Sequence, residues 1–129
     1  MDRRRLISSA MPWEASIGYS RAVVAGDHVF VSGTAPVMPA GADPPADAYG
    51  QARRCLEIVL AALAEAGAEP DDVVRTRMYL TRADDIGEVG RAHGDVFGDV
   101  RPATTGVVVA ALLDPRWLVE IEADAIIAR

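Results

Sequence analysis

The alternation of apolar and polar residues along the chain predicts strands near both ends and one strand in the middle. Two short apolar runs, residues 23–25 and 29–31, are separated by Gly26 and Asp27. A glycine at the first turn position suits a tight hairpin between two such runs. The other strands that we expect cover residues 73–81, 103–112 and 118–127.

Two segments between these strands carry apolar residues at helical spacing instead. In the first segment Asp47 is suited to cap the N-terminus of a helix, and Gly67 lies where that helix would end. The apolar stripe between them consists of Ala52, Leu56, Val59, Leu60 and Leu63.

The second helix is expected to begin near Asp84 or Asp85, with Glu88 placed to complete a capping box. The predicted order is then strand pair, helix, strand, helix, strand pair. This order favours an α+β fold in which two helices cover one face of a mixed sheet. Residues 36–47 are rich in Pro, Ala and Gly, so we expect a surface loop there. The apolar stripe of the second helix consists of Ile86, Val89, Val96 and Phe97.

The other face of the predicted sheet carries charges of both signs. Arginines and carboxylates that share one side of neighbouring strands can pair across the ladder. From the residues alone, this face is either solvated on a monomer or covered by other subunits. In the middle strand, alternation places Arg75, Arg77 and Tyr79 on one side and Val74, Met78 and Leu80 on the other. In the last strand Leu118, Glu120, Glu122 and Asp124 share one face, and Val119, Ile121, Ala123 and Ala125 share the opposite face.

Length and composition indicate one folded domain that covers residues 1–129. Half of the residues are hydrophobic (50%), which excludes a disordered chain, and no apolar run approaches the length of a membrane span. The arginines near the N-terminus are not followed by a long apolar stretch, so no signal peptide is expected. Cys55 is the only cysteine, which fits a cytoplasmic protein. The net charge of -6 argues against binding to nucleic acid.

Few residues are typical of a catalytic or metal centre. His93 falls on the apolar stripe of the second helix, which predicts a packed, hydrogen-bonded histidine, and His28 follows a hairpin turn and is expected to be exposed. Cys55 lies among core positions of the first helix and is expected to act as a small hydrophobic residue. These three residues lie on different elements, so neither a metal site nor a cofactor motif is indicated.

Several segments of the chain together form a recognisable signature. Near the C-terminus it is Pro102-Ala103-Thr104-Thr105, followed by a valine run and then by Glu-Ile-Glu-Ala at residues 120–123. The earlier segments are residues 17–23 (IGYSRAV), 29–33 (VFVSG), 51–56 (QARRCL) and 66–76. Together they resemble the RidA (YjgF-like) family of imine and enamine deaminases. The family has an arginine where this chain has Thr104.

The resemblance implies a chorismate-mutase-like α+β fold: a mixed six-stranded sheet with two helices on one face, assembled as a homotrimer. It places ligand clefts between subunits and maps the ligand contacts onto Tyr19, Ser32, Gly33, Thr104 and Thr105. Glu120 would position or deprotonate the water that attacks a C=N carbon, and backbone groups near Gly33 and Thr105 would bind or polarise the substrate. The alternatives are an ion pair of Glu120 with Arg75 or Arg77, and simple interface packing of Tyr19.

Thr104 argues against assigning the usual deaminase activity of the family to this chain unchanged. An arginine holds a carboxylate by two charge-assisted bonds, whereas a threonine offers one neutral donor. Arg77 on the charged sheet face, or Arg101 in the preceding loop, would have to bind any ligand anion instead.

We therefore expect a trimer that binds a small metabolite and hydrolyses or deaminates an imine, enamine or related compound by positioned water, without a metal or organic cofactor. Thr104 argues against a standard 2-iminopropanoate deaminase. The alternative is a small-molecule-binding trimer without catalysis. A role with nucleic acid or in translation ranks third because of the negative charge.

Overall fold

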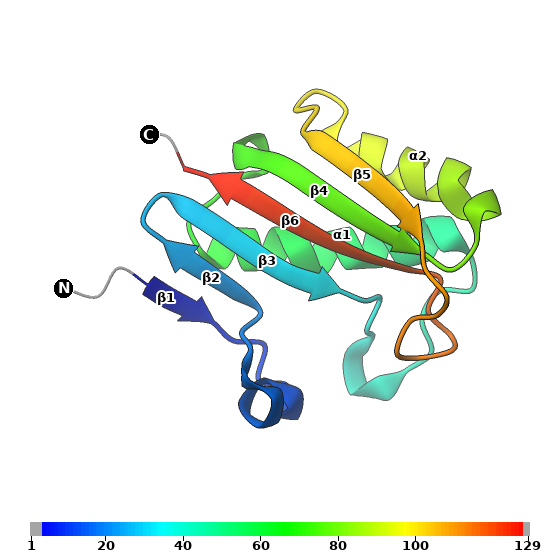
Figure 1. Cartoon of the computed structure of the whole chain (residues 1–129), viewed down its shortest axis with the longest axis horizontal. Helices are drawn as coiled ribbons and strands as arrows, with labels where there is room; N and C mark the ends of the chain where they lie inside the picture. The colour runs from blue at the N-terminus through cyan, green and yellow to red at the C-terminus, as the bar shows by residue number, and fades with distance from the viewer. Residues whose placement is uncertain (1–3, 128–129) are drawn as a thin grey trace.

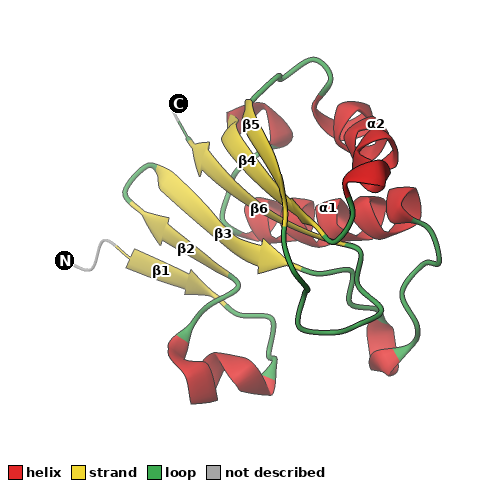
Figure 2. Ribbon diagram, turned by 45° about the vertical axis from the view of Figure 1, so that its right-hand side comes forward, coloured by secondary structure: helices red, strands yellow, loops and turns green. Residues whose placement is uncertain are grey.

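Six strands form one mixed sheet, and two helices pack against one of its faces (Figures 1 and 2). The computed structural model describes residues 4–127, so residues 1–3 and 128–129 of the expected domain lie outside the described part. The strand order is β1-β2-β3-β6-β4-β5, and every pair is antiparallel except β4–β5, which is parallel. The strands are β1 (Arg4–Ile7), β2 (Ala22–Ala25), β3 (His28–Thr34), β4 (Val73–Leu80), β5 (Ala103–Val108) and β6 (Val119–Ile126).

The first helix, α1 (Ala48–Glu65), begins and ends where its sequence predicts. The Asp47 carboxylate accepts a hydrogen bond from the Gly50 backbone N–H at 2.8 Å and so satisfies one free donor of the first turn. Gly67 follows the helix with a φ of 89°, a left-handed conformation that glycine adopts without steric cost.

The second helix, α2 (Ile86–Phe97), begins at the expected place, but the predicted capping box is wrong. No side chain caps this helix at Asp85, whose carboxylate instead binds Arg82 at 2.7 Å. The Glu88 carboxylate accepts from the Tyr49 backbone N–H at 3.3 Å. Glu88 therefore links the two helices rather than closing the first turn of its own helix.

The core lies between the helices and the covered face of the sheet. His93 is packed as predicted: its Nε2 lies 2.8 Å from Thr76 Oγ1, and its ring centroid lies 4.9 Å from that of Phe97. Cys55 is fully buried, its Sγ lies 3.7 Å from the Val119 carbonyl oxygen, and burial raises the pKa of the thiol far above its usual range. The largest fully buried side chains include Phe97, Leu56, Leu63, Leu80 and Ile121.

Two features of the sheet differ from the predicted pattern. The register between β4 and β6 shifts between Val73 and Arg75, so Val73 is buried and Val74 is 43% exposed, against the expectation for Val74. The extra residue of such an irregularity reverses which side chain faces the core. Strand β1 pairs with β2 although only Ile7 of its residues is buried, and its sequence pattern did not indicate a strand.

Strand β5 forms one edge of the sheet and all of its residues are exposed. Its backbone pairs with β4 on one side only, and Val107 and Val108 are 44% and 55% exposed. An exposed apolar edge strand is a surface that a second chain can cover. No helix within residues 4–127 is long and apolar enough to cross a membrane.

Candidate functional site

Glu120 projects from the uncovered face of the sheet, directly beside Gly33. Strict alternation in β6 buries Val119 and Ile121 in the core and leaves Glu120 half-buried on the other side. The register between β3 and β6 shifts between Val31 and Thr34, so Gly33 lies in an irregular stretch. A Cβ atom at Gly33 would overlap the Glu120 carboxylate, so a larger residue at this position would displace that carboxylate.

Burial makes the Glu120 carboxylate a stronger base than an ordinary glutamate. Its pKa is raised, first by loss of solvent and also by the negative charge of Glu122, while the positive charge of Arg21 acts in the opposite direction. In the described part of the chain Glu120 forms no ion pair, so its predicted pairing with Arg75 or Arg77 is absent there. A half-buried carboxylate without a fixed counter-ion can accept a proton from water.

The end of β3 lies against this carboxylate at Gly33, and the segment before β2 brings Arg21 near enough to act on its charge. Tyr19 follows a short helical turn, Glu14–Gly18, and is 39% exposed. Ser32 Oγ donates to the Ser20 carbonyl oxygen at 2.7 Å, so this hydroxyl is engaged within the chain. The phenol of Tyr19 and the carboxylate of Glu120 are both close enough to Arg21 to influence its pKa.

Sequence reasoning missed Arg21. Its Nη2 donates to the carbonyl oxygens of Ser32 and Gly33, the latter at 3.0 Å, and to Thr34 Oγ1 at 2.6 Å. The available signal was its place immediately after the Tyr19-Ser20 pair, opposite the strand that carries Gly33.

Arg77 lies on the same sheet face, but its charge is balanced by carboxylates of β6. Its Nη1 lies 3.2 Å from Glu122 Oε1 and 3.4 Å from Asp124 Oδ2, which is the cross-strand pairing predicted for this face. The Tyr79 hydroxyl donates to Glu122 Oε1 at 2.9 Å, and burial followed by this bond raises the pKa of Tyr79. Arg77 therefore already has two anionic partners within the chain.

The remaining predicted residues lie on β5 or just before it. Thr104 Oγ1 donates to the Pro102 carbonyl oxygen at 3.0 Å and lies 2.8 Å from Thr76 Oγ1. Thr76 in turn contacts His93, so a chain of hydrogen bonds runs from the exposed edge strand to α2. Thr105 is paired with Arg77 in the β4–β5 ladder. Arg101 lies in the loop before β5, is exposed and has a φ of 57°.

A single chain does not bring these residues together. Strand β4 separates β5 from β6, so Thr104 and Thr105 are about 10 Å from the strand that carries Glu120, given the usual spacing between strands. A hollow of about 310 Å³ is lined by Asp43, Pro44, Pro45, Ala46, Gln51 and Arg116, and Glu120 is not among its residues. The candidate residues thus form two groups: the Glu120 group (Tyr19, Ser32, Gly33, Glu120) and the β5 group (Arg101, Thr104, Thr105).

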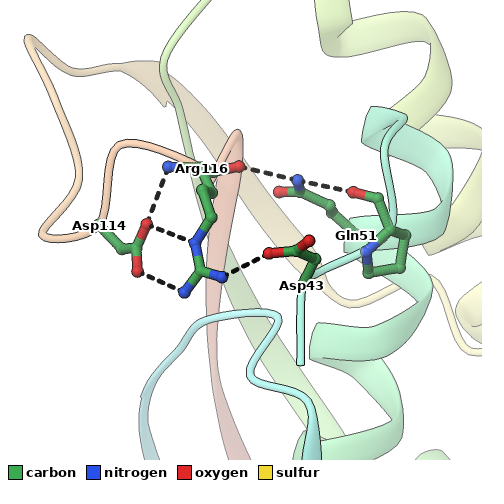
Figure 3. A network of polar contacts seen from close by, with 5 residues as sticks. Asp43, Gln51, Asp114 and Arg116 are labelled. Carbon is green, nitrogen blue, oxygen red and sulfur yellow. Dashed lines mark hydrogen bonds and ion pairs between the residues drawn. The ribbon is translucent and has the colours of Figure 1, made fainter. Parts of the chain in front are cut away.

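A polar network that the sequence did not indicate holds the start of β6 in place (Figure 3). Arg116 binds Asp114 through its Nη2 at 2.9 Å and Asp43 through its Nη1 at 2.9 Å. The bond to Asp43 joins the loop between β5 and β6 to the loop between β3 and α1. Gln51, buried in α1, donates to the Arg116 carbonyl oxygen at 3.0 Å and accepts from the Leu118 backbone N–H at 2.7 Å. These bonds fix the backbone two residues before Glu120.

No group of three or more His, Cys, Asp or Glu side chains within residues 4–127 could hold a metal ion. The chemistry available to the two groups is proton transfer at Glu120 and hydrogen bonding from backbone and hydroxyl groups.

Comparison with known proteins identifies the family. The family model described as Endoribonuclease L-PSP matches residues 9–127. A protein of Streptomyces coelicolor is 40% identical over 121 residues, which cover 94% of this chain and 90% of the relative. TdcF of Escherichia coli, named for reactive intermediate deaminase activity, is 32% identical over 110 residues, which cover 84% of this chain and 85% of TdcF.

Solved structures of the same family share the fold. Rv2704 from Mycobacterium tuberculosis, a member of the YjgF/YER057c/UK114 family, matches with a TM-score of 0.87 and 44% identity over 95% of this chain and 98% of its own. E. coli TdcF, crystallised with bound serine, matches with a TM-score of 0.79 and 30% identity over 95% of this chain and 93% of its own. Sequence and fold therefore agree that the chain belongs to the YjgF/RidA family.

Proposed function

We propose that this chain, a single domain over residues 1–129, forms a cytoplasmic homotrimer that binds a small metabolite in clefts between subunits. In each cleft the Glu120 group of one subunit faces the β5 group of a neighbour. The trimer hydrolyses an imine, enamine or related compound to a carbonyl product and ammonia. Membership in a family that includes TdcF, named for reactive intermediate deaminase activity, supports this class of reaction.

The observation that carries the proposal is the half-buried, proton-accepting carboxylate of Glu120 packed against Gly33. As a water oxygen bonds to the imine carbon, Glu120 accepts a proton from that water, the C=N π electrons move to the nitrogen, and Glu120 returns the proton to the nitrogen. Glu120 then takes the proton of the added hydroxyl and passes it to the amine, so that the C–N bond breaks, ammonia leaves and the carbonyl forms. Backbone N–H groups near Gly33 and Thr105 would stabilise the developing charge.

Thr104 indicates that the substrate differs from 2-iminopropanoate. Its single hydroxyl proton is directed to the Pro102 carbonyl, so the exposed oxygen offers lone pairs rather than a donor. A carboxylate needs donors, and Arg77 is already paired with Glu122 and Asp124. Arg101, exposed in the neighbouring loop, is the arginine that we propose for a ligand anion, because Arg21 is engaged with backbone carbonyls of β3.

The threonine at position 104 also favours a second candidate, a trimer that binds a metabolite without transforming it. E. coli TdcF has been crystallised with bound serine, so small-molecule binding occurs within this family. The ribonuclease name of the family model finds no support in the charge of this chain, because a net charge of -6 repels a phosphate backbone.

An assay of ammonia release tests the proposed reaction. Imines without a carboxylate are generated in solution from a panel of amines by a flavin-dependent amine oxidase, and 2-iminopropanoate is generated from alanine by an amino-acid oxidase, with catalase present in both cases. The decay of each imine is followed with and without the protein. We expect acceleration for at least one imine that lacks a carboxylate and a much weaker effect on 2-iminopropanoate. Saturable binding of a panel compound without acceleration of any imine would favour the binding-only trimer.

We expect the protein to sediment as a trimer at micromolar concentration. The apolar edge strand β5 and the division of the candidate site between two separated groups both motivate this expectation. Sedimentation velocity provides the measurement, and Val108→Glu on the exposed edge should weaken assembly. A wild-type monomer at this concentration would remove the proposed clefts.

A further inference from the structure

We propose that Arg21, a residue outside the predicted site, is a positioning residue for Glu120. Its guanidinium holds the Ser32–Gly33 backbone against the Glu120 carboxylate and supplies the positive charge that favours the ionised form. This inference rests on the proposed role of Glu120 as the base.

Arg21 holds the backbone around Gly33. One nitrogen of Arg21, Nη2, donates to the carbonyl oxygens of both Ser32 and Gly33 and to Thr34 Oγ1. The chain has no cis peptide among the described residues, so the N–H of each of these two peptides points away from its carbonyl and from Arg21. Arg21 thereby orients this irregular stretch, in which Gly33 touches Glu120.

No carboxylate of the described residues pairs with the positive charge of Arg21. It is half-buried, its three bonds from Nη2 go to neutral acceptors, and it forms no ion pair within the described part of the chain. Its buried Nε has no hydrogen-bond partner. Arg77, in contrast, is balanced by Glu122 and Asp124. A cation without a contacting carboxylate still acts on charges that it does not touch, and Glu120 is one of these.

The other titratable groups near Glu120 cannot replace Arg21. Glu122 on β6 disfavours the ionised form of Glu120, and Tyr79 on β4 is neutral because its pKa is raised. Cys55 on α1 is a buried neutral thiol. Tyr19 and Glu14, from the segment before β2, bear on Arg21 itself and carry no positive charge. Without Arg21, burial and Glu122 would both favour protonated Glu120.

The test separates charge from hydrogen bonding by comparing Arg21→Gln with Arg21→Lys. Glutamine removes the charge and keeps an N–H donor, whereas lysine keeps the charge and places its three N–H donors on one flexible ammonium instead of a planar guanidinium. The titration of Glu120 is followed by carbon NMR of protein with labelled glutamate, assigned by its loss in Glu120→Gln. The measurement needs no substrate, so it stands even if the proposed reaction fails.

For Arg21→Gln we expect the Glu120 titration midpoint to rise by about one pH unit, as removal of a nearby charge predicts. For the best imine of the panel, the pH at which the rate of hydrolysis falls on the acid side should rise by a similar amount. Arg21→Lys should stay near the wild-type midpoint, and Glu122→Gln should lower it. Circular dichroism verifies folding, and Arg21→Met is the second uncharged variant if the glutamine variant does not fold.

Two results would overturn the proposal. An unchanged Glu120 midpoint in a folded Gln or Met variant would exclude the electrostatic role. Equal upward shifts in the Lys and Gln variants would show that backbone disorder, rather than loss of charge, moves the titration.

Discussion

Replacing Glu120 by glutamine is expected to slow hydrolysis of the best imine substrate by about 100- to 10,000-fold, the usual contribution of a general base. Glutamine is nearly the same size as glutamate and still fits against Gly33, but it cannot accept a proton from water. The effect should fall on kcat more than on KM, because the lost interaction forms in the transition state. Steady-state ammonia release at neutral pH measures it.

Stability provides a control for this variant. Burial raises the folded-state pKa of Glu120, so its ionised form disfavours folding at neutral pH. This cost decreases as the pH falls through the folded-state pKa and is gone below the unfolded-state pKa. Glu120→Gln should therefore be at least as stable as wild type at pH 7, and the difference should shrink in acid. Glu122→Gln is the matched variant on the same strand face, and it should retain most of the activity. Wild-type turnover by a folded Glu120→Gln trimer would refute the base assignment.

The sequence predicted the position of Glu120 well because β6 alternates without interruption. Its apolar residues, such as Val119 and Ile121, must face the helices, so the carboxylates of β6 lie on the face of the sheet that the helices do not cover. The helix ends were also predictable, since Asp47 and Gly67 act through local backbone geometry alone.

Features that depend on contacts between distant segments were not predictable. Val74 was expected in the core, but one irregular residue in the β4–β6 ladder exposes it. Strand β1 carries little apolar signal and exists because β2 offers it a partner. Arg21 looks like an ordinary surface arginine in the sequence, and only the arrangement of β3 shows that its acceptors are backbone carbonyls.

The way in which the two groups of candidate residues come together was not predictable either. The family motifs identify the Glu120 group and the β5 group, but within one chain β4 lies between them. Neither periodicity nor a single folded chain can show which surfaces of separate subunits meet. The exposed edge of β5 is the structural reason to expect that a neighbouring subunit completes the cleft.

Restoring an arginine at position 104 should convert the protein toward a 2-iminopropanoate deaminase. Thr104 is exposed at the sheet edge, so a longer side chain has room to leave the contact with Thr76. Burial lowers the pKa of His93 beyond Thr76, so this histidine is neutral at pH 7 and does not repel a new cation. A charge-assisted hydrogen bond contributes about 1.5–3 kcal/mol, so we expect kcat/KM for 2-iminopropanoate to rise about 10- to 100-fold in Thr104→Arg.

Thr104→Lys and Thr104→Val are the matched controls for this experiment. Lysine adds charge without the planar fork of arginine and should give a smaller gain, whereas valine preserves the shape without the hydroxyl and should give none. All variants are compared as trimers, by the same coupled assay of imine decay. If Thr104→Arg assembles normally and hydrolyses the imine no faster than Thr104→Val, then no side chain at position 104 of β5 binds the substrate carboxylate. The anion would then be bound by Arg101 in the loop before β5, and Arg101→Ala in the wild-type background should lose it.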